Sequence, residues 1–123
     1  MIKEAYCSFE VAKLLKEKGF NEPCRAVYEE EILRINTLCD YHNSELSSYV
    51  CAPTLQMAMN WLREKGIECV VIPIWNTLGK QYRSYVLSDL GDRYKDNYDS
   101  YSDNISYKEA VEAALKYCLE NLI

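Results

Sequence analysis

Glycine and histidine are both scarce in this sequence of 123 residues, and each scarcity argues against a class of chemistry. The four glycines are isolated from one another, so neither a P-loop nor a glycine-rich dinucleotide fingerprint is present. The one histidine, His42, would have to serve any Cys–His enzyme, and no glycine-rich nucleophile turn accompanies a cysteine. We therefore expect no catalytic residue and no cofactor.

Long apolar runs are also missing. The longest, Cys69–Trp75, is far shorter than the roughly 20 residues that a membrane-spanning helix needs. Residues 1–20 mix charged with apolar side chains and lack the continuous apolar segment of a secretory signal. We therefore expect a cytoplasmic protein that does not associate with a membrane.

Positive charge is in deficit. The net charge is −5 and the pI is near 4.9, which disfavours a broad electrostatic grip on nucleic-acid phosphates or acidic membranes but is compatible with a small basic patch. The hydrophobic share of 49% and the charged share of 27% are those of an ordinary globular protein. The length predicts a single domain over residues 1–123.

Cysteine is plentiful but unpatterned. In a protein that is not exported, six scattered cysteines without a C-x-x-C pair are expected to be thiols that fill the core. Cys39 and His42 form a C-x-x-H pair with Cys51 further on, yet no fourth zinc ligand is evident. The aspartates of residues 89–104 are spaced too widely for a calcium loop. We expect no metal.

Three helices are indicated by their caps and apolar stripes. The first begins after Ser8 and ends at Gly19, where Phe20 is expected to fold back on Leu15. The second begins at residues 52–54 and closes at Gly66. Its buried stripe is Leu55, Ala58, Met59 and Leu62. The third is capped by Ser106 with Glu109, with Ile105 as a staple onto Ala110.

Four strands form two hairpins. They are expected at Arg25–Tyr28, Ile32–Asn36, Glu68–Trp75 and Gln81–Ser88. Pro73 lacks a backbone N–H and therefore places its strand at a sheet edge or at a bulge. Polar loops are expected over Thr37–Tyr49 and Asp89–Asn104.

The order α-β-β-α-β-β-α predicts an α+β fold in two layers. Because a hairpin alone does not bury a face, its antiparallel sheet must pack against the helices. The polar side chains are therefore expected to decorate a helix-on-sheet body and not to converge on a reactive cleft.

Three blocks of this sequence resemble a family of small proteins carried by phages, prophages and mobile elements of intestinal bacteria. The first block runs from Ser8 to Phe20, the second from Ala52 to Glu64 and the third from Ser106 to Leu115. They occur in the same order in that family. The resemblance implies a cytoplasmic setting in a bacterium or a phage-infected cell. It assigns no catalytic or binding residue to this chain.

Two segments are candidates for partner binding. In the 68–88 hairpin, Trp75, Arg83 and Tyr85 combine aromatic with basic groups near Lys80 and Tyr82, as sheets that bind single-stranded nucleic acid do. Strand alternation puts Arg83 and Tyr85 on one face and Tyr82 on the other, so that one face belongs to the core.

The second segment carries Tyr94, Tyr98 and Tyr101. Their spacing suits a helical aromatic stripe, while the surrounding Asp and Asn are also compatible with a segment that covers the sheet edge.

Eleven tyrosines and the absence of a catalytic pattern favour a non-enzymatic binding or accessory protein that acts through protein contacts. Self-association into a homo-oligomer fits the same pattern. The alternative is a small nucleic-acid-binding module that uses the 68–88 hairpin.

Overall fold

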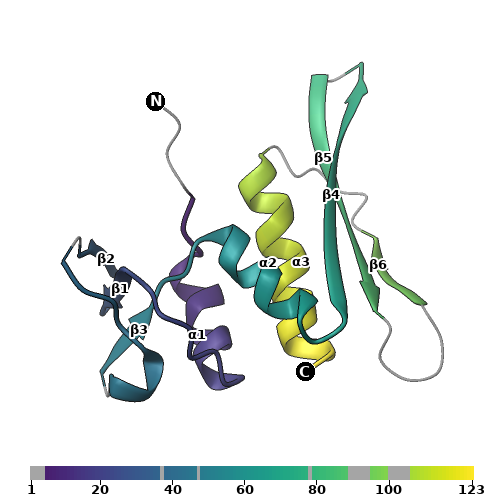
Figure 1. The fold of residues 1–123 in the computed structure, drawn as a ribbon. Coiled ribbons are helices and arrows are strands. Elements are labelled where there is room, and N and C mark those ends of the chain that lie inside the picture. The colour runs from purple at the N-terminus through teal and green to yellow at the C-terminus, as the bar shows by residue number, and fades with distance from the viewer. Residues whose placement is uncertain (1–4, 37, 47, 78, 89–94, 100–105) are drawn as a thin grey trace. The chain divides into compact units, whose positions relative to one another are not determined.

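The computed structural model describes residues 5–36, 38–46, 48–77, 79–88, 95–99 and 106–123 (Figure 1). Its elements in chain order are α1 (Phe9–Glu17), β1 (Ala26–Glu29), β2 (Ile32–Ile35), the short 3-10 helix η1 (Asn43–Glu45), β3 (Tyr49–Cys51), α2 (Leu55–Arg63), β4 (Ile67–Asn76), β5 (Gly79–Ser88), β6 (Lys95–Asp99) and α3 (Tyr107–Asn121). None of the described helices is both long and apolar enough to cross a membrane.

The chain divides into two compact units, residues 1–58 and 59–123, with the boundary inside α2. Each unit contains a three-stranded antiparallel sheet. The α+β class with helices packed on hairpins is confirmed. The strands form two sheets, however, because each hairpin gains a third strand of its own. That the whole chain is one domain stays a prediction.

The first unit packs α1 against the sheet β2-β1-β3, in which β1 is central. Its core cluster joins Ala12 of α1 to Ala26, Tyr28 and Ala52. The ring of Phe9 meets that of Tyr28 edge to face at 5.5 Å between centroids. The Tyr28 hydroxyl donates to a carbonyl oxygen 2.6 Å away, so this buried polar group is satisfied.

The ends of α1 follow the sequence expectation. The Ser8 hydroxyl accepts a hydrogen bond from the Val11 N–H at 3.3 Å. At the other end Gly19 has a φ of 96°, and the Phe20 N–H donates to the Leu15 carbonyl at 2.9 Å. This is the Schellman pattern, and it directs the chain out of the helix towards β1.

The second unit packs α3 against β4 and β5 of the sheet β4-β5-β6. The β4–β5 hairpin pairs ten residues on each side, from Ile67 opposite Ser88 to Asn76 opposite Gly79. Pro73 lies in β4, at the edge of this sheet, as its missing N–H requires. The Ser106 hydroxyl caps α3 by accepting from the Glu109 N–H at 3.1 Å, whereas the expected Ile105 staple lies outside the described residues.

Two segments that the sequence predicted to be loops contain regular structure. The first, Thr37–Tyr49, contains η1 and the beginning of β3. The second, Asp89–Asn104, contains β6, which pairs with β5 across an irregularity at Val86/Leu87. Both strands are polar or very short and are held by partners remote in sequence, so local patterning did not indicate them.

Candidate functional site

β2 is an edge strand that exposes apolar side chains on both of its faces. Ile32 is 57% exposed, Leu33 36% and Ile35 56%, and the nearby Leu38 is 92% exposed. Proteins commonly protect sheet edges with charged side chains, lysine above all, and with proline, bulges, short strands or covering segments. Strand β2 (Ile-Leu-Arg-Ile) is short and has neither proline nor lysine, and its one charged side chain, Arg34, is paired with Glu29 of the neighbouring strand.

The backbone of β2 has a defined outward side. The Asn36 N–H donates to the Arg25 carbonyl at 2.7 Å, which makes these two residues a hydrogen-bonded pair. In an antiparallel ladder such pairs alternate, so Arg34 and Ile32 also direct their backbone groups at β1. The N–H and C=O groups of Leu33 and Ile35 therefore point away from the sheet. We call this outward side of Ile32–Ile35 the β2 edge.

The edges at β3 and β4 are protected. In β3 the Cys51 N–H donates to the Asn43 side-chain oxygen at 2.9 Å, and the Tyr49 carbonyl accepts from the Lys16 ammonium at 2.8 Å. In β4 the residue Pro73 interrupts the row of donors. Within the described part of the chain, no strand pairs with the β2 edge.

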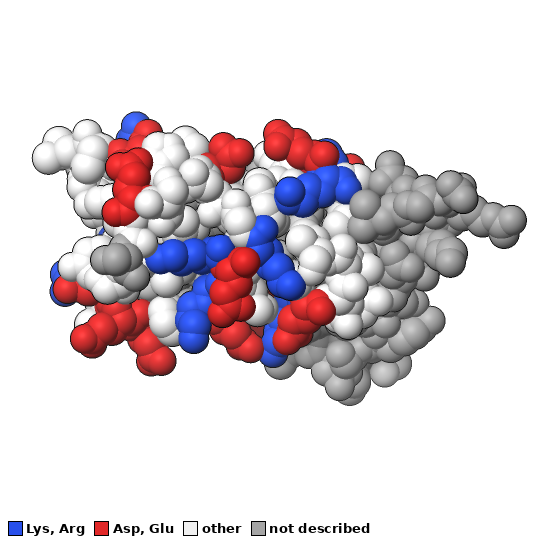
Figure 2. Space-filling model, turned by 90° about the horizontal axis from the view of Figure 1, so that it is seen from below, with Lys and Arg blue, Asp and Glu red and all other residues white. Residues whose placement is uncertain are grey.

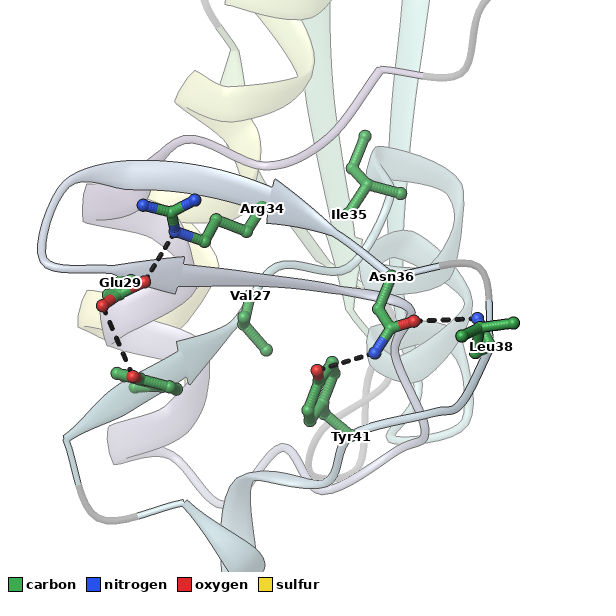
Figure 3. Close-up of a pocket in the computed structure, with 8 residues that line it drawn as sticks. Val27, Glu29, Arg34, Ile35, Asn36, Leu38 and Tyr41 are labelled. Carbon is green, nitrogen blue, oxygen red and sulfur yellow. Dashed lines mark hydrogen bonds and ion pairs between the residues drawn. The ribbon is translucent and has the colours of Figure 1, made fainter.

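A hollow of about 470 Å³ lies beside this strand, on one face of the sheet. Figure 3 shows Arg34 and Glu29 at one end of the hollow, Asn36 with Tyr41 at the other, and Val27 between them. We call it the Val27 hollow. It is lined by Val27, Glu29, Arg34, Ile35, Asn36, Leu38, Tyr41 and Tyr49.

The polar groups of the Val27 hollow hold one another in place. Arg34 Nε lies 2.6 Å from Glu29 Oε2, and the Tyr49 hydroxyl lies 3.4 Å from Glu29 Oε1. The Asn36 amide donates to the Tyr41 hydroxyl at 2.8 Å and accepts from the Leu38 N–H at 2.8 Å. Groups paired in this way are held in fixed positions, and no nucleophile with an adjacent base occurs among them.

The imidazole of His42 pairs with a carboxylate and not with a thiol. Its Nδ1 lies 3.0 Å from Glu45 Oε1 on the surface, and the two side chains are 36% and 68% exposed. Cys39 instead contacts the Asn36 amide nitrogen at 3.1 Å. Among the described residues, no group of three or more His, Cys, Asp and Glu side chains is arranged to hold a metal ion.

All six cysteines lie in the described part of the chain as thiols, and five of them are buried; Cys39 is the exposed exception to the expected core role. Cys24 and Cys51 form one buried pair, in which the hydrogen bond between the thiols raises the pKa of Cys24 and lowers that of Cys51. The sulfurs of Cys69 and Cys118 lie 3.8 Å apart, and their hydrogen bond, with burial, raises the pKa of Cys118.

The residues expected on the 68–88 hairpin divide between two faces. Arg83 and Tyr85 share one face, where an Arg83 nitrogen lies 3.5 Å from the Tyr85 hydroxyl. Trp75, 69% exposed, lies on the other face with Tyr82, because directly paired strand residues share a face. Lys80 lies over the rings of Trp75 and Tyr82, at 5.4 Å and 5.2 Å from their centroids.

Of the three tyrosines expected to bind a partner, Tyr94 and Tyr101 lie outside the described residues. Tyr98 lies in β6 opposite Val86. The helical interpretation is therefore wrong at Tyr98, and the segment Lys95–Asp99 pairs with β5 as a sheet edge.

Charges are mixed on the face that Figure 2 draws. Blue and red side chains lie next to one another there. An electrostatic contact with a nucleic-acid backbone is typically made by a patch or stripe in which Lys and Arg gather without acidic neighbours.

Sequence reasoning found the second strand of the first hairpin but missed its exposure. Apolar residues on both faces of a strand are typical of burial on both faces, so the local pattern of β2 gave no sign of its exposure.

Comparisons of the chain with protein-family models, with curated proteins and with solved structures find no match. The resemblance to the family of phage and mobile-element proteins stays a prediction. The function is therefore inferred from the geometry of the site.

Proposed function

We propose that this chain is a non-enzymatic binding protein that docks a protein partner through the β2 edge. The observation that carries the proposal is the difference between edges: Asn43, Lys16 and Pro73 protect β3 and β4, whereas among the described residues no strand pairs with the outward backbone groups of the β2 edge, which lie beside exposed apolar side chains. An added strand satisfies such groups and covers such side chains. The resemblance of three sequence blocks supports a setting in the cytoplasm of a bacterium or a phage-infected cell.

The Val27 hollow supports the same proposal. It adjoins β2, and its polar wall is held by the Arg34–Glu29 pair and by Asn36 with Tyr41. A partner strand along β2 directs every second side chain towards this face of the sheet. The edge then supplies backbone hydrogen bonds, and the hollow discriminates among side chains.

Capture of partners from bacterial cytosol with three matched baits tests the proposal. Leu33→Lys puts a charge at the β2 edge, and Ile72→Lys makes the same change on β4 at nearly equal exposure, 36% against 38%. The wild type and Ile72→Lys should retain a partner that Leu33→Lys loses. Equal capture by all three baits would contradict the role of β2, and turnover in a substrate screen that one side-chain change abolishes would contradict a non-enzymatic role.

A second candidate function is the binding of single-stranded nucleic acid at the tip of the β4–β5 hairpin. It is favoured by the exposure of Trp75 and by Lys80 beside it. Lys80 lies over one face of the Trp75 ring, and Arg83 lies on the opposite face of the hairpin. A mobility-shift assay at low salt tests this function: a shift lost in Trp75→Ala and Lys80→Ala would support it, and no shift with the wild type would end it.

A further inference from the structure

The outward backbone groups of β2 need a partner that is itself an extended strand with unpaired groups. A second copy of this chain presents such a strand already ordered by its pairing with β1. A flexible peptide must lose conformational entropy to take up the same shape. We propose that the partner of the β2 edge is a second copy of this chain, joined by antiparallel β2–β2 pairing around a two-fold axis. This inference rests on the proposed function and names its partner.

Symmetry and hydrogen bonding restrict the register. A two-fold interface brings the same strand of both copies together antiparallel. Outward-facing residues must meet outward-facing residues, so a Leu33 that lies opposite strand β2 of the second copy pairs either with Leu33 or with Ile35. A register in which all four residues of the strand overlap would place Ile32 opposite Ile35. It would set residues whose backbone groups point outward against residues whose backbone groups point inward, so no hydrogen-bond ladder would form between the two copies.

Charge selects between these two registers. Pairing Leu33 with Ile35 places the two Arg34 residues directly opposite each other, with Cα atoms about 4.5 Å apart, and like charges in that position repel. Pairing Leu33 with Leu33 instead places Arg34 opposite Ile32 of the second copy. The aliphatic part of Arg34 then covers Ile32, while its guanidinium stays on Glu29 at 2.6 Å.

The chosen register also accounts for the exposed side chains. Leu33 meets its own counterpart at the axis, and Ile35 lies opposite Glu31 of the second copy. At the strand end, Glu30 faces Asn36, so no two like charges are apposed. The product is a six-stranded sheet in the order β3-β1-β2-β2-β1-β3, in which both ends are the β3 edges already protected by Lys16 and Asn43.

Sedimentation equilibrium of the full chain tests the inference. The wild type and Ile72→Lys should reach twice the 14.3 kDa of one chain at micromolar to millimolar concentration. Leu33→Lys, which sets two ammonium groups across the axis, should weaken self-association by at least roughly tenfold. A wild type that stays at the mass of one chain, or a Leu33→Lys variant as dimeric as the wild type, would overturn the inference.

A second variant keeps the test decisive if Leu33→Lys does not fold. Leu33→Pro removes an N–H that points away from β1, so the intramolecular ladder loses no hydrogen bond. We expect a folded monomer, as judged by circular dichroism and sedimentation. A folded Leu33→Pro dimer would contradict the pairing.

Cross-linking tests the register. In a Cys39→Ser background, which removes the one exposed thiol, Leu33→Cys places two cysteines at a pair with Cα atoms about 5.5 Å apart, within disulfide range. Mild oxidation with a disulfide reagent should cross-link Leu33→Cys faster than Arg34→Cys. The opposite order would contradict the pairing of Leu33 with itself.

Failure of this inference and failure of the proposed function give different results. A monomeric wild type that still captures a partner lost in Leu33→Lys would leave the docking function standing and replace the second copy by another protein. A monomeric wild type whose capture does not depend on Leu33 would contradict both.

Discussion

Asn43 connects three segments of the first unit through one buried amide. Its nitrogen donates to the Phe20 carbonyl at 2.8 Å, and its oxygen accepts from the Cys51 N–H at 2.9 Å. The first hydrogen bond fixes the chain where it leaves α1, and the second protects the outer side of β3. Nothing in the local sequence distinguishes this asparagine from the exposed polar residues around it, so sequence reasoning missed it.

Asn43→Ala should lower the free energy of unfolding by about 2–6 kcal/mol, because two buried backbone groups lose their partners at about 1–3 kcal/mol each. Asn21→Ala is the matched control, since the Asn21 oxygen accepts from the Ser44 N–H at 2.8 Å at an exposed site. It should cost less than about 1 kcal/mol. Urea denaturation measures both, and equal losses would contradict the bridging role of Asn43.

The Cys69–Cys118 pair predicts a decline of stability in alkali. The hydrogen bond to Cys69, with burial, raises the pKa of the Cys118 thiol above its ordinary value of 9.0. Above that pH the unfolded chain loses this proton while the folded chain keeps it, so the unfolded state binds fewer protons and stability falls as pH rises. Below pH 9.0 the contribution of this thiol to the free energy of unfolding does not change with pH.

Denaturation from neutral pH upwards measures this effect. The wild type should lose up to about 1.4 kcal/mol per pH unit more than Cys118→Ala, which has no thiol to titrate at this position. Groups outside this pair titrate equally in both proteins and cancel in the difference. Parallel pH profiles of the two proteins would contradict the account of this pair.

At the scale of elements, the sequence predicted the features that depend on residues close together in the chain. Ser8, Ser106 and Gly19 mark helix ends through hydrogen bonds within a few residues, and all three act as expected. Pro73 indicated an edge because it lacks a donor. β3 and β6 depend on pairing with β1 and β5, and such remote partners leave no local periodicity.

The candidate site was predictable only in part. The first hairpin was expected, but the exposure of β2 follows from its place at the end of the sheet order β2-β1-β3. The aromatic and basic side chains expected together around Trp75 lie on two faces of the hairpin, because side chains alternate along a strand and Trp75 is thereby separated from Arg83.

The β1–β2 turn carries local strain at Glu30, which has a φ of 59° and is the one non-glycine residue with a positive φ among those described. This conformation costs a side chain on the order of 1 kcal/mol and costs glycine little. Glu30→Gly should therefore raise the free energy of unfolding by up to about 1 kcal/mol. Glu31→Gly removes the same charge without relieving strain and should lower it by about 0.5 kcal/mol. A thermal melt in which Glu31→Gly is the more stable variant would contradict this explanation of the turn.

At the scale of the whole molecule, each copy carries a net charge of −5, so two copies repel at long range. Added salt screens this repulsion and leaves backbone pairing and apolar contacts in place. Raising the salt concentration from about 0.05 to about 0.5 M should leave self-association unchanged or strengthen it. Dissociation by salt, measured by sedimentation, would indicate an electrostatic contact and contradict β2 pairing.

Amide hydrogen exchange resolved by residue tests the docking role of the β2 edge most directly. Ile32 and Arg34 donate towards β1 and should be protected at every protein concentration. Leu33 and Ile35 donate outward, so their exchange should be slow in concentrated protein and become fast on dilution. Fast exchange of Leu33 and Ile35 at every concentration, with or without a captured partner, would contradict the account.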